Sequence, residues 1–214
     1  AWEMVAHRLA ARSGIIVPEA KIVRLGGDHR TYCSRRFDRR GGTRAFFASA
    51  MTLLQKDSRA RASYVELAEW LARHGDPACI AGDLEQLYRR VVFNVCTGNR
   101  DDHLRNHGFL LTPAGWRLSP AYDVNPSPEL SEHVLAIDDA DPRPDLSTVA
   151  ATSAFYGLSE NRSRAIVQGV RTVVRAGQGA GRELGRAEGC VDYVGIQRAL
   201  TTAFLVFGGL TFAW

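Results

Sequence analysis

The spacing of apolar residues predicts three helices in the first half of the chain. Residues 1–13 have apolar side chains at helical intervals, and a Ser-Gly pair ends this helix. A second helix is predicted over residues 63–73, where Ser63 and Glu66 have the spacing of a capping box. A third helix, over residues 83–97, is apolar on most sides, which is typical of a helix at the centre of a fold.

Apolar runs separated by turn residues predict two β-hairpins. The first pairs residues 20–25 with residues 31–37 across the turn Gly26-Gly27-Asp28. The second pairs residues 107–111 with residues 116–118 across a Thr-Pro-Ala-Gly turn. Strands and helices do not alternate regularly, so the predicted fold class is α+β.

The remaining segments are predicted to be mostly helical. A short helical run covers residues 45–54. Further helices are expected to begin near Ser147, Ser159 and Gly189. The Gly-rich stretch over residues 176–185 is expected to connect two of these helices.

After Arg198 the chain carries no charged residue. This apolar run is shorter than the roughly 18–20 residues that a membrane-spanning helix needs, and a Gly-Gly pair interrupts it. We therefore expect the end of a core helix followed by an apolar tail. A membrane-facing or partner-facing segment is the alternative.

Composition changes this picture only slightly. The chain has 214 residues, which corresponds to one to one and a half domains. Its formal net charge is 27 − 23 = +4, which permits an anionic ligand or nucleic acid without requiring either. Lys21 and Lys56 are the only lysines, so chemistry that needs a lysine has two candidates.

The cysteines are too far apart in sequence for a metal knuckle or a disulfide framework: Cys33, Cys79, Cys96 and Cys190. We expect four buried thiols in a reducing compartment, hence a cytoplasmic protein. The chain begins within a helical pattern, without Met and without a signal sequence, so we expect it to be a fragment or a cut domain.

A polar loop between the third helix and the second hairpin carries the candidate chemistry. Asp101 lies five positions before Asn106, and Asp123 follows the hairpin. An Asp at this spacing can accept the proton of a hydroxyl while the Asn amide oxygen binds a metal ion. A carboxylate brought in by a hairpin can bind the same Mg²⁺ between nucleotide phosphates. The pattern therefore indicates magnesium-dependent phosphoryl transfer.

Two other interpretations fit the same loop. Its acids could cap helices and form ion pairs with Arg100 and Arg105. The clustered side chains could instead hold two metal ions in a phosphohydrolase, with ligands Asp101, Asp102, His103 and Asp123.

The loop resembles the catalytic segment of HipA-type serine/threonine kinases, which reads approximately D-x-H-x-K-N-F and then L-x-P-x-Y-D. The matching positions here are Asp101, His103, Arg105, Asn106, His107, Leu118, Pro120, Tyr122 and Asp123. Residues 35–40 (RRFDRR) resemble the family's E-R-F-D-R strand at the nucleotide hinge. The opening helix with Glu3, followed by G-x-x-V-P-x-A over residues 14–20, is a third similarity.

This resemblance implies roles for individual residues. Asp101 would orient and deprotonate the substrate hydroxyl, and Asn106 and Asp123 would bind Mg²⁺. Glu3 resembles the helix Glu that pairs with the phosphate-binding lysine.

The resemblance also implies a nucleotide hinge. The backbone of Arg35, Arg36 and Phe37 would face the adenine of ATP, and Asp38 would reach toward the ribose. Arg35 replaces a Glu of the family pattern, which backbone contacts would tolerate.

Plainer roles remain open for several of these side chains. Asp102 is expected to be a solvated or helix-capping acid rather than a second base. His103 is expected to form structural hydrogen bonds beside the loop. Asp38 could simply pair with a neighbouring arginine, and Glu3 could be an ordinary exposed helix acid.

The resemblance implies a mainly helical, kinase-like large lobe with a small β-hairpin hinge region and with most of the small lobe absent. Residues 1–44 would form the hinge region and residues 45–214 the lobe, with the catalytic loop at residues 98–125. The implied cofactors are ATP and Mg²⁺, the substrate is a protein, and a DNA-binding antitoxin is the partner in a bacterial toxin–antitoxin pair. Direct nucleic-acid binding is not established by the sequence, and no membrane contact is expected.

Two parts of the family's nucleotide site are not found in the sequence. No Gly-rich phosphate loop and no strand lysine precede the Glu3 helix, and Lys21 follows that helix. We therefore expect an incomplete fragment that binds nucleotide weakly and transfers little or no phosphate. A catalytically inactive interaction module is the alternative, although the retained Asp101, Asn106 and Asp123 argue against it.

Overall fold

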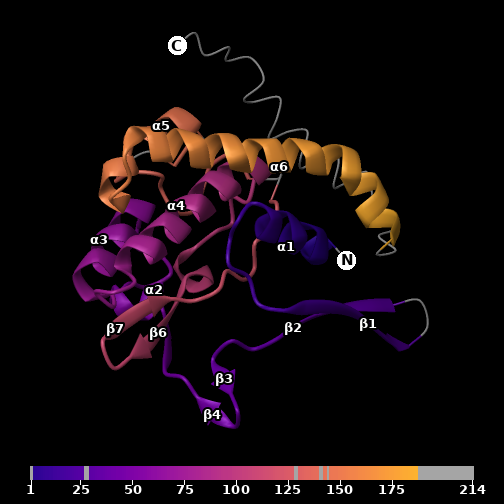
Figure 1. Cartoon of the computed structure of the whole chain (residues 1–214), viewed down its shortest axis with the longest axis horizontal. Helices are drawn as coiled ribbons and strands as arrows, with labels where there is room; N and C mark the ends of the chain where they lie inside the picture. Colours follow the sequence, from indigo (N-terminus) through magenta and orange to yellow (C-terminus); the bar gives the residue numbers. More distant parts are fainter. Residues whose placement is uncertain (1, 27–28, 128–129, 140–141, 144, 188–214) are drawn as a thin grey trace.

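The computed structural model describes residues 2–26, 29–127, 130–139, 142–143 and 145–187. It confirms the α+β class, with helices forming the bulk of the molecule and short antiparallel strands at its side (Figure 1). The helices are α1 (Trp2–Arg12), α2 (Ala50–Leu53), α3 (Tyr64–His74), α4 (Ile80–Thr97), α5 (Leu146–Ala151) and α6 (Glu160–Ala187), with 3-10 turns η1 (Leu104–Asn106) and η2 (Ser153–Tyr156). The strands are β1 (Ala20–Gly26), β2 (His29–Ser34), β3 (Arg39–Arg40), β4 (Thr43–Arg44), β5 (Phe47–Ser49), β6 (Gly108–Thr112) and β7 (Gly115–Leu118).

Helix α4 lies at the centre of the packing, as its apolar sequence predicts. It begins at Ile80, three residues before the predicted start, and α3, α5 and α6 pack against it. Its buried apolar side chains are Leu84, Leu87, Tyr88, Val91, Val92, Phe93 and Val95. Burial on nearly every side makes α4 the element against which the polar loop at its end is held.

Helix α6 runs across both α4 and α1 (Figure 1). The prediction that residues 176–185 connect two helices is wrong, because α6 continues through them to Ala187. Packing against α1 supplies the physical reason, since α6 contacts α1 and Gly177 lies directly against Leu9, which favours the helix despite the low helix propensity of Gly.

The predicted starts of the later helices agree closely with the structure. Ser159 caps α6, where its Oγ accepts a hydrogen bond from the Arg162 amide at 3.3 Å. Helix α5 begins at Leu146, and Asp145 rather than Ser147 is its N-cap. The helix expected near Gly189 and the tail after Arg198 lie outside the described residues.

The predicted capping box of α3 is half realised. Ser63 Oγ accepts a hydrogen bond from the Glu66 amide at 3.1 Å. The Glu66 carboxylate pairs with Lys56 instead of returning to the cap. The ion pair with Lys56 therefore replaces the hydrogen bond from the Ser63 amide to Glu66 that would complete the capping box.

The first hairpin is confirmed as the antiparallel pair β1–β2, with Ala20 opposite Ser34 and Gly26 opposite His29. Residues 35–37 were predicted to belong to its second strand, but the strand ends at Ser34. The Arg35 amide still donates to the Glu19 carbonyl at 2.8 Å, and the chain then turns toward β3. The arginine-rich hinge segment is therefore a loop between two hairpins.

A three-stranded antiparallel sheet, in the order β5-β6-β7, contains the predicted second hairpin. The prediction of helix over residues 45–54 is only partly correct. Phe47 pairs with Leu110 in β5 before Ser49 caps the short helix α2. Pairing with a strand far along the chain competes here with the local helical preference.

No helix in the described part of the chain is long and apolar enough to cross a membrane. Cys33, Cys79 and Cys96 are free thiols. They are half-buried rather than fully buried as expected, and Cys190 lies outside the described residues.

Candidate active site

Helix α4 delivers the polar loop directly from the core. The helix ends at Gly98, whose left-handed φ of 71° lets its amide donate to the Asn94 carbonyl. The loop then exposes Asp101 and buries Asp102. Asn106 is buried at the end of η1, where its amide donates to the His103 carbonyl at 2.8 Å.

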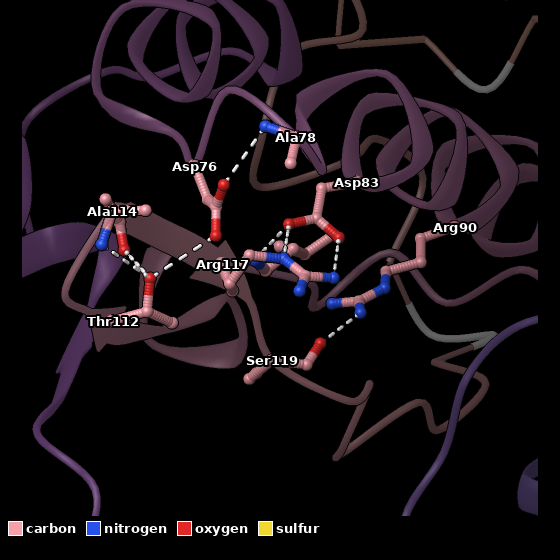
Figure 2. A network of polar contacts seen from close by, with 10 residues as sticks. Asp76, Ala78, Asp83, Arg90, Thr112, Ala114, Arg117 and Ser119 are labelled. Carbon is pink, nitrogen blue, oxygen red and sulfur yellow. Dashed lines mark hydrogen bonds and ion pairs between the residues drawn. The ribbon is translucent and has the colours of Figure 1, made fainter.

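Helix α4 also fixes the segment that leads to Asp123. Figure 2 shows Asp83 facing the Arg117 guanidinium, with Nε to Oδ2 at 2.7 Å and Nη2 to Oδ1 at 3.1 Å. Asp83 Oδ2 also accepts the Leu118 amide at 3.0 Å. Two turns further on the same helix face, Arg90 donates through Nη2 to the Ser119 carbonyl (Figure 2). These contacts hold the end of β7 against α4.

Tyr122 joins this segment to the polar loop. Its hydroxyl donates to the Arg105 carbonyl at 2.7 Å. Burial raises the pKa of the Tyr122 phenol, while the nearby Arg90 lowers it, so the phenol stays protonated and donates. Tyr122 precedes Asp123 and Arg105 precedes Asn106. The bond therefore holds the segment of Asp123 beside the segment of Asn106.

Asp123 itself is exposed and has a left-handed backbone, with φ of 55°. The Asn125 amide donates to Asp123 Oδ1 at 3.0 Å. This contact orients the carboxylate and leaves its other oxygen without a partner among the described residues.

The donor set around this point fits Mg²⁺. Magnesium prefers oxygen ligands and is commonly held by one or two carboxylates together with substrate phosphates and water. Neither Asp101 nor the Asn106 amide makes a side-chain hydrogen bond to the described part of the chain, so their oxygens are free to bind a ligand. Asp123 supplies a further exposed carboxylate on the segment that Tyr122 ties to the loop.

The structure offers no support for a two-metal phosphohydrolase. No group of three or more His, Cys, Asp or Glu side chains in the described ranges could hold a metal ion. Asp102, one of the expected ligands, is buried and hydrogen-bonded within the protein. Nor do the ion pairs expected for Arg100 and Arg105 form with the loop acids of the described chain; Arg100 donates to the Leu130 carbonyl.

Glu3 approaches the loop from α1. Its side chain is half-buried, so the alternative of an ordinary exposed helix acid is not the one realised. Burial raises the pKa of Glu3, and the negative charge of Asp123 raises it further. The charges of Glu3 and Asp123 therefore influence one another.

The hinge segment meets the same region through an aromatic cluster. The Phe37 ring stacks on Tyr122 with a centroid distance of 5.7 Å and lies 5.8 Å from the Phe47 ring. Tyr122 directly precedes Asp123. Phe37 therefore lies at the edge of the candidate site.

Other hinge side chains are occupied by ion pairs. Arg36 binds both Asp38 oxygens, at 2.8 and 2.6 Å, and hydrogen bonding to Arg36 lowers the pKa of Asp38. Arg35 donates to Glu19 at 2.9 Å. The plainer interpretation of Asp38 as the partner of an arginine is the one realised.

Two expectations for the loop itself are wrong. Asp102 is neither solvated nor a helix cap, since it is 3% exposed and accepts three side-chain hydrogen bonds. His103 does not form the expected structural hydrogen bond, because its buried Nδ1 has no partner among the described residues. Partners of Asp102 such as Tyr64 and Asn94 belong to other elements, and no local sequence motif predicts these contacts.

Comparison with known proteins gives a consistent result. A family model described as the HipA-like C-terminal domain matches residues 1–177. The serine/threonine-protein kinase toxin HipA of Shewanella oneidensis is 29% identical over 145 residues, which cover 57% of this chain and 33% of that protein. The chain thus spans about a third of the curated relative's length.

Solved structures show the same fold. HipA of Shewanella oneidensis, in a complex with HipB and its operator DNA, matches with a TM-score of 0.73 and 21% identity, covering 95% of this chain and 55% of that one. The Helicobacter pylori proinflammatory kinase CtkA matches with a TM-score of 0.51 and 11% identity, covering 96% and 86%. The architecture is therefore that of a kinase-like α+β lobe.

Proposed function

Because this chain belongs to the HipA-like C-terminal domain family, we propose that it carries the catalytic loop and metal site of a serine/threonine protein kinase. The proposed catalytic residue is Asp101, and the proposed Mg²⁺ ligands are Asn106 and Asp123. The observation that carries this proposal is the contact of the Tyr122 hydroxyl with the Arg105 carbonyl, which ties the Asp123 segment to the loop of Asp101 and Asn106.

In this proposal Asp101 orients a serine or threonine hydroxyl of a protein substrate and accepts its proton. Its exposed carboxylate, without a side-chain partner in the described chain, suits this task. Mg²⁺, when bound, would neutralise charge on the ATP phosphates. Asn106 and Asp123 would hold the metal from two chain segments, so that its position depends on the Tyr122 contact.

The nucleotide end of the site is proposed to lie at the hinge. The backbone of Arg35, Arg36 and Phe37 would face the adenine, and Phe37 is already stacked beside Asp123's neighbour. Asp38 would have to leave Arg36 to reach the ribose. Glu3, whose pKa is raised in part by the charge of Asp123, would be the helix acid that pairs with a phosphate-binding lysine.

We further propose a division into a hinge region over residues 1–44 and a kinase-like lobe over residues 45–214. The related HipA was solved with HipB and operator DNA. By this likeness, the protein that contains the present chain would be the toxin of a toxin–antitoxin pair, with a DNA-binding antitoxin as partner.

The test is binding of Mn²⁺ with ADP to the 214-residue chain, followed by electron paramagnetic resonance. Mn²⁺ takes oxygen ligands as Mg²⁺ does and is directly detectable. Asp123→Asn and Asn106→Ala should each abolish measurable nucleotide-dependent metal binding, because each removes a proposed ligand. Glu69→Gln, which changes an exposed carboxylate on α3, should bind as the wild type does. Wild-type affinity in Asp123→Asn would reject the proposed metal site.

A further inference from the structure

A buried polar network lies directly beneath the polar loop. The Asp102 carboxylate is its centre: Oδ2 accepts hydrogen bonds from the Tyr64 hydroxyl at 2.6 Å, Asn94 Nδ2 at 2.7 Å and His107 Nε2 at 2.7 Å. Asn94 Oδ1 in turn accepts from Asn99 Nδ2 at 3.0 Å. We call these five residues the anchoring network.

The anchoring network connects the start, middle and end of the loop to the core. Asn99 follows the end of α4, Asp102 is in the middle of the loop, and His107 precedes β6. Tyr64 and Asn94 belong to the buried faces of α3 and α4. The loop is therefore held at three points to two helices that do not themselves belong to it.

The network is buried and charged. Its residues are at most 3% exposed. Burial raises the pKa of Asp102, but the charge and hydrogen bond of His107 and the Tyr64 hydroxyl lower it overall. Hydrogen bonds to an ionised, buried acceptor are short and strong, and losing one leaves a charge without compensation.

Two members of the network are sequence neighbours of proposed functional residues. Asp102 follows Asp101, and His107 follows Asn106. In each pair, one side chain is hydrogen-bonded within the network. The polar group of the other, Asp101 or Asn106, has no side-chain hydrogen bond to the described part of the chain. The hydrogen bond between Asp102 and His107 therefore constrains the position of Asp101 relative to Asn106.

Resting on the proposed function, we infer that the anchoring network positions the Asn106 metal ligand relative to Asp101, with Asp102, His107 and Tyr64 as positioning residues. His107 stands where the HipA-type pattern has Phe, so this chain holds its loop by a hydrogen bond at a position where that pattern has an apolar ring. Tyr64 supports the His107 ring as well, edge-on at a centroid distance of 5.7 Å.

The experiment uses the same Mn²⁺ and ADP binding measurement on the 214-residue chain. His107→Leu removes the donor to Asp102 and should weaken binding roughly tenfold or more, the usual effect of losing a group that orients a metal ligand. His107→Gln keeps an N–H donor and should restore most of the affinity. Tyr64→Phe removes only a hydroxyl and should also weaken binding.

Tyr88→Phe is the matched control. The Tyr88 hydroxyl is buried and shares a hydrogen bond of 2.7 Å with Ser163 Oγ, away from the loop. It should lower thermal stability, as Tyr64→Phe does, while keeping wild-type metal affinity. Equal losses of affinity in both tyrosine variants would mean that binding follows global stability, and the inference would be overturned.

The outcomes separate this inference from the function on which it rests. Wild-type affinity in His107→Leu and Tyr64→Phe, together with lost binding in Asp123→Asn, would overturn the inference and leave the metal site in place. Wild-type affinity in Asp123→Asn would reject both. If His107→Leu does not fold, Tyr64→Phe and its control still decide the question.

Discussion

At the scale of single residues, His133 is a buried base without a hydrogen-bond partner at either ring nitrogen in the described chain. It is 4% exposed, and its backbone amide donates to the Pro142 carbonyl at 2.8 Å. Burial lowers the pKa of the imidazole to about 4; Asp102 and the Asn99 backbone raise it, and Arg100 lowers it. His133 is therefore neutral in the folded protein at neutral pH.

This burial predicts a pH dependence of stability. The unfolded chain takes up a proton at His133 near pH 6.5, whereas the folded protein does so only near pH 4. Between these values the unfolded state binds more protons, so the free energy of unfolding falls as the pH is lowered. The loss approaches a magnitude on the order of 3 kcal/mol by pH 4. Urea unfolding of the wild type and of His133→Gln from pH 7 to pH 4 measures it.

The difference in the free energy of unfolding between the wild type and His133→Gln separates the contribution of His133 from that of the carboxylates. Hydrogen bonding to Arg162 lowers the pKa of Glu85, so its stabilising contribution is lost only at lower pH, below its ordinary value of 4.5. His133→Gln should therefore show a flatter profile between pH 6.5 and pH 4. Parallel profiles for the two proteins would contradict the assignment.

The proposed catalytic residues and their supports differ in how far sequence could predict them. The spacing of Asp101, Asn106 and Asp123 is a local signal, because a loop and a hairpin determine it. Asp102 carries no such signal, since its donors Tyr64 and Asn94 meet it only after α3 and α4 have packed. Tertiary packing therefore decides that Asp101 is exposed while Asp102 is buried.

At the scale of elements, α6 and α1 pack closely where α6 has a glycine. A Cβ added to Gly177 would lie 2.4 Å from Leu9 Cδ2 and 3.4 Å from Leu9 Cγ. Leu9 is itself buried, so it has little space to move. A Cβ at Gly169, in the same helix, would meet nothing within 4 Å.

Two alanine substitutions should thus have opposite effects on stability. Gly169→Ala should raise the free energy of unfolding by about 0.5–1 kcal/mol, because Ala favours the helix and constrains the unfolded chain. Gly177→Ala gains the same preference but forces Leu9 out of its place, at a cost of roughly 1–3 kcal/mol. Thermal unfolding followed by circular dichroism should give a higher Tm for the first variant and a lower Tm for the second. A raised Tm in Gly177→Ala would show that Leu9 adapts easily.

These glycines also explain which elements local sequence predicts poorly. Residues 176–185 have the composition of a connection, but Gly177 admits Leu9 and so allows α1 and α6 to approach. Strand β5 is the reverse case. Residues 45–54 have helical spacing, but Phe47 pairs with Leu110 and belongs to a strand. In both places a partner distant in sequence decides the local conformation.

At the scale of the whole molecule, three distant segments meet at Asp123. Glu3 comes from α1, Phe37 from the loop between two hairpins, and Tyr122 from the segment that follows β7. Motif order in the sequence predicts that these segments belong to one site, but it leaves open whether Asp38 faces a ribose or pairs with a neighbouring arginine such as Arg36. The fold determines that the segments converge, whereas the hydrogen bonds of each side chain depend on its immediate neighbours.

The 214-residue polypeptide should nevertheless show no robust phosphoryl transfer. The proposed site residues would hold a metal and orient a hydroxyl, but the sequence contains no Gly-rich loop to surround the β- and γ-phosphates. Lys21, exposed on β1 opposite Cys33, is the nearest substitute for a strand lysine. Radiolabelled ATP turnover and autophosphorylation should remain at background, and Lys21→Ala should change neither. Magnesium-dependent transfer that Asp123→Asn abolishes would show that no further phosphate-binding element is needed.

The left-handed backbone of Asp123 limits how this site can change over evolutionary time. A φ of 55° is readily adopted by Gly, Asn and Asp but is strained for most other residues and most of all for β-branched ones. A lineage that no longer needs the carboxylate can therefore exchange it without structural penalty for Asn or Gly, each one nucleotide change away from Asp. Among natural variants of this chain, those that have lost the proposed metal ligand without loss of the fold should have Asn or Gly at position 123 far more often than Val or Ile.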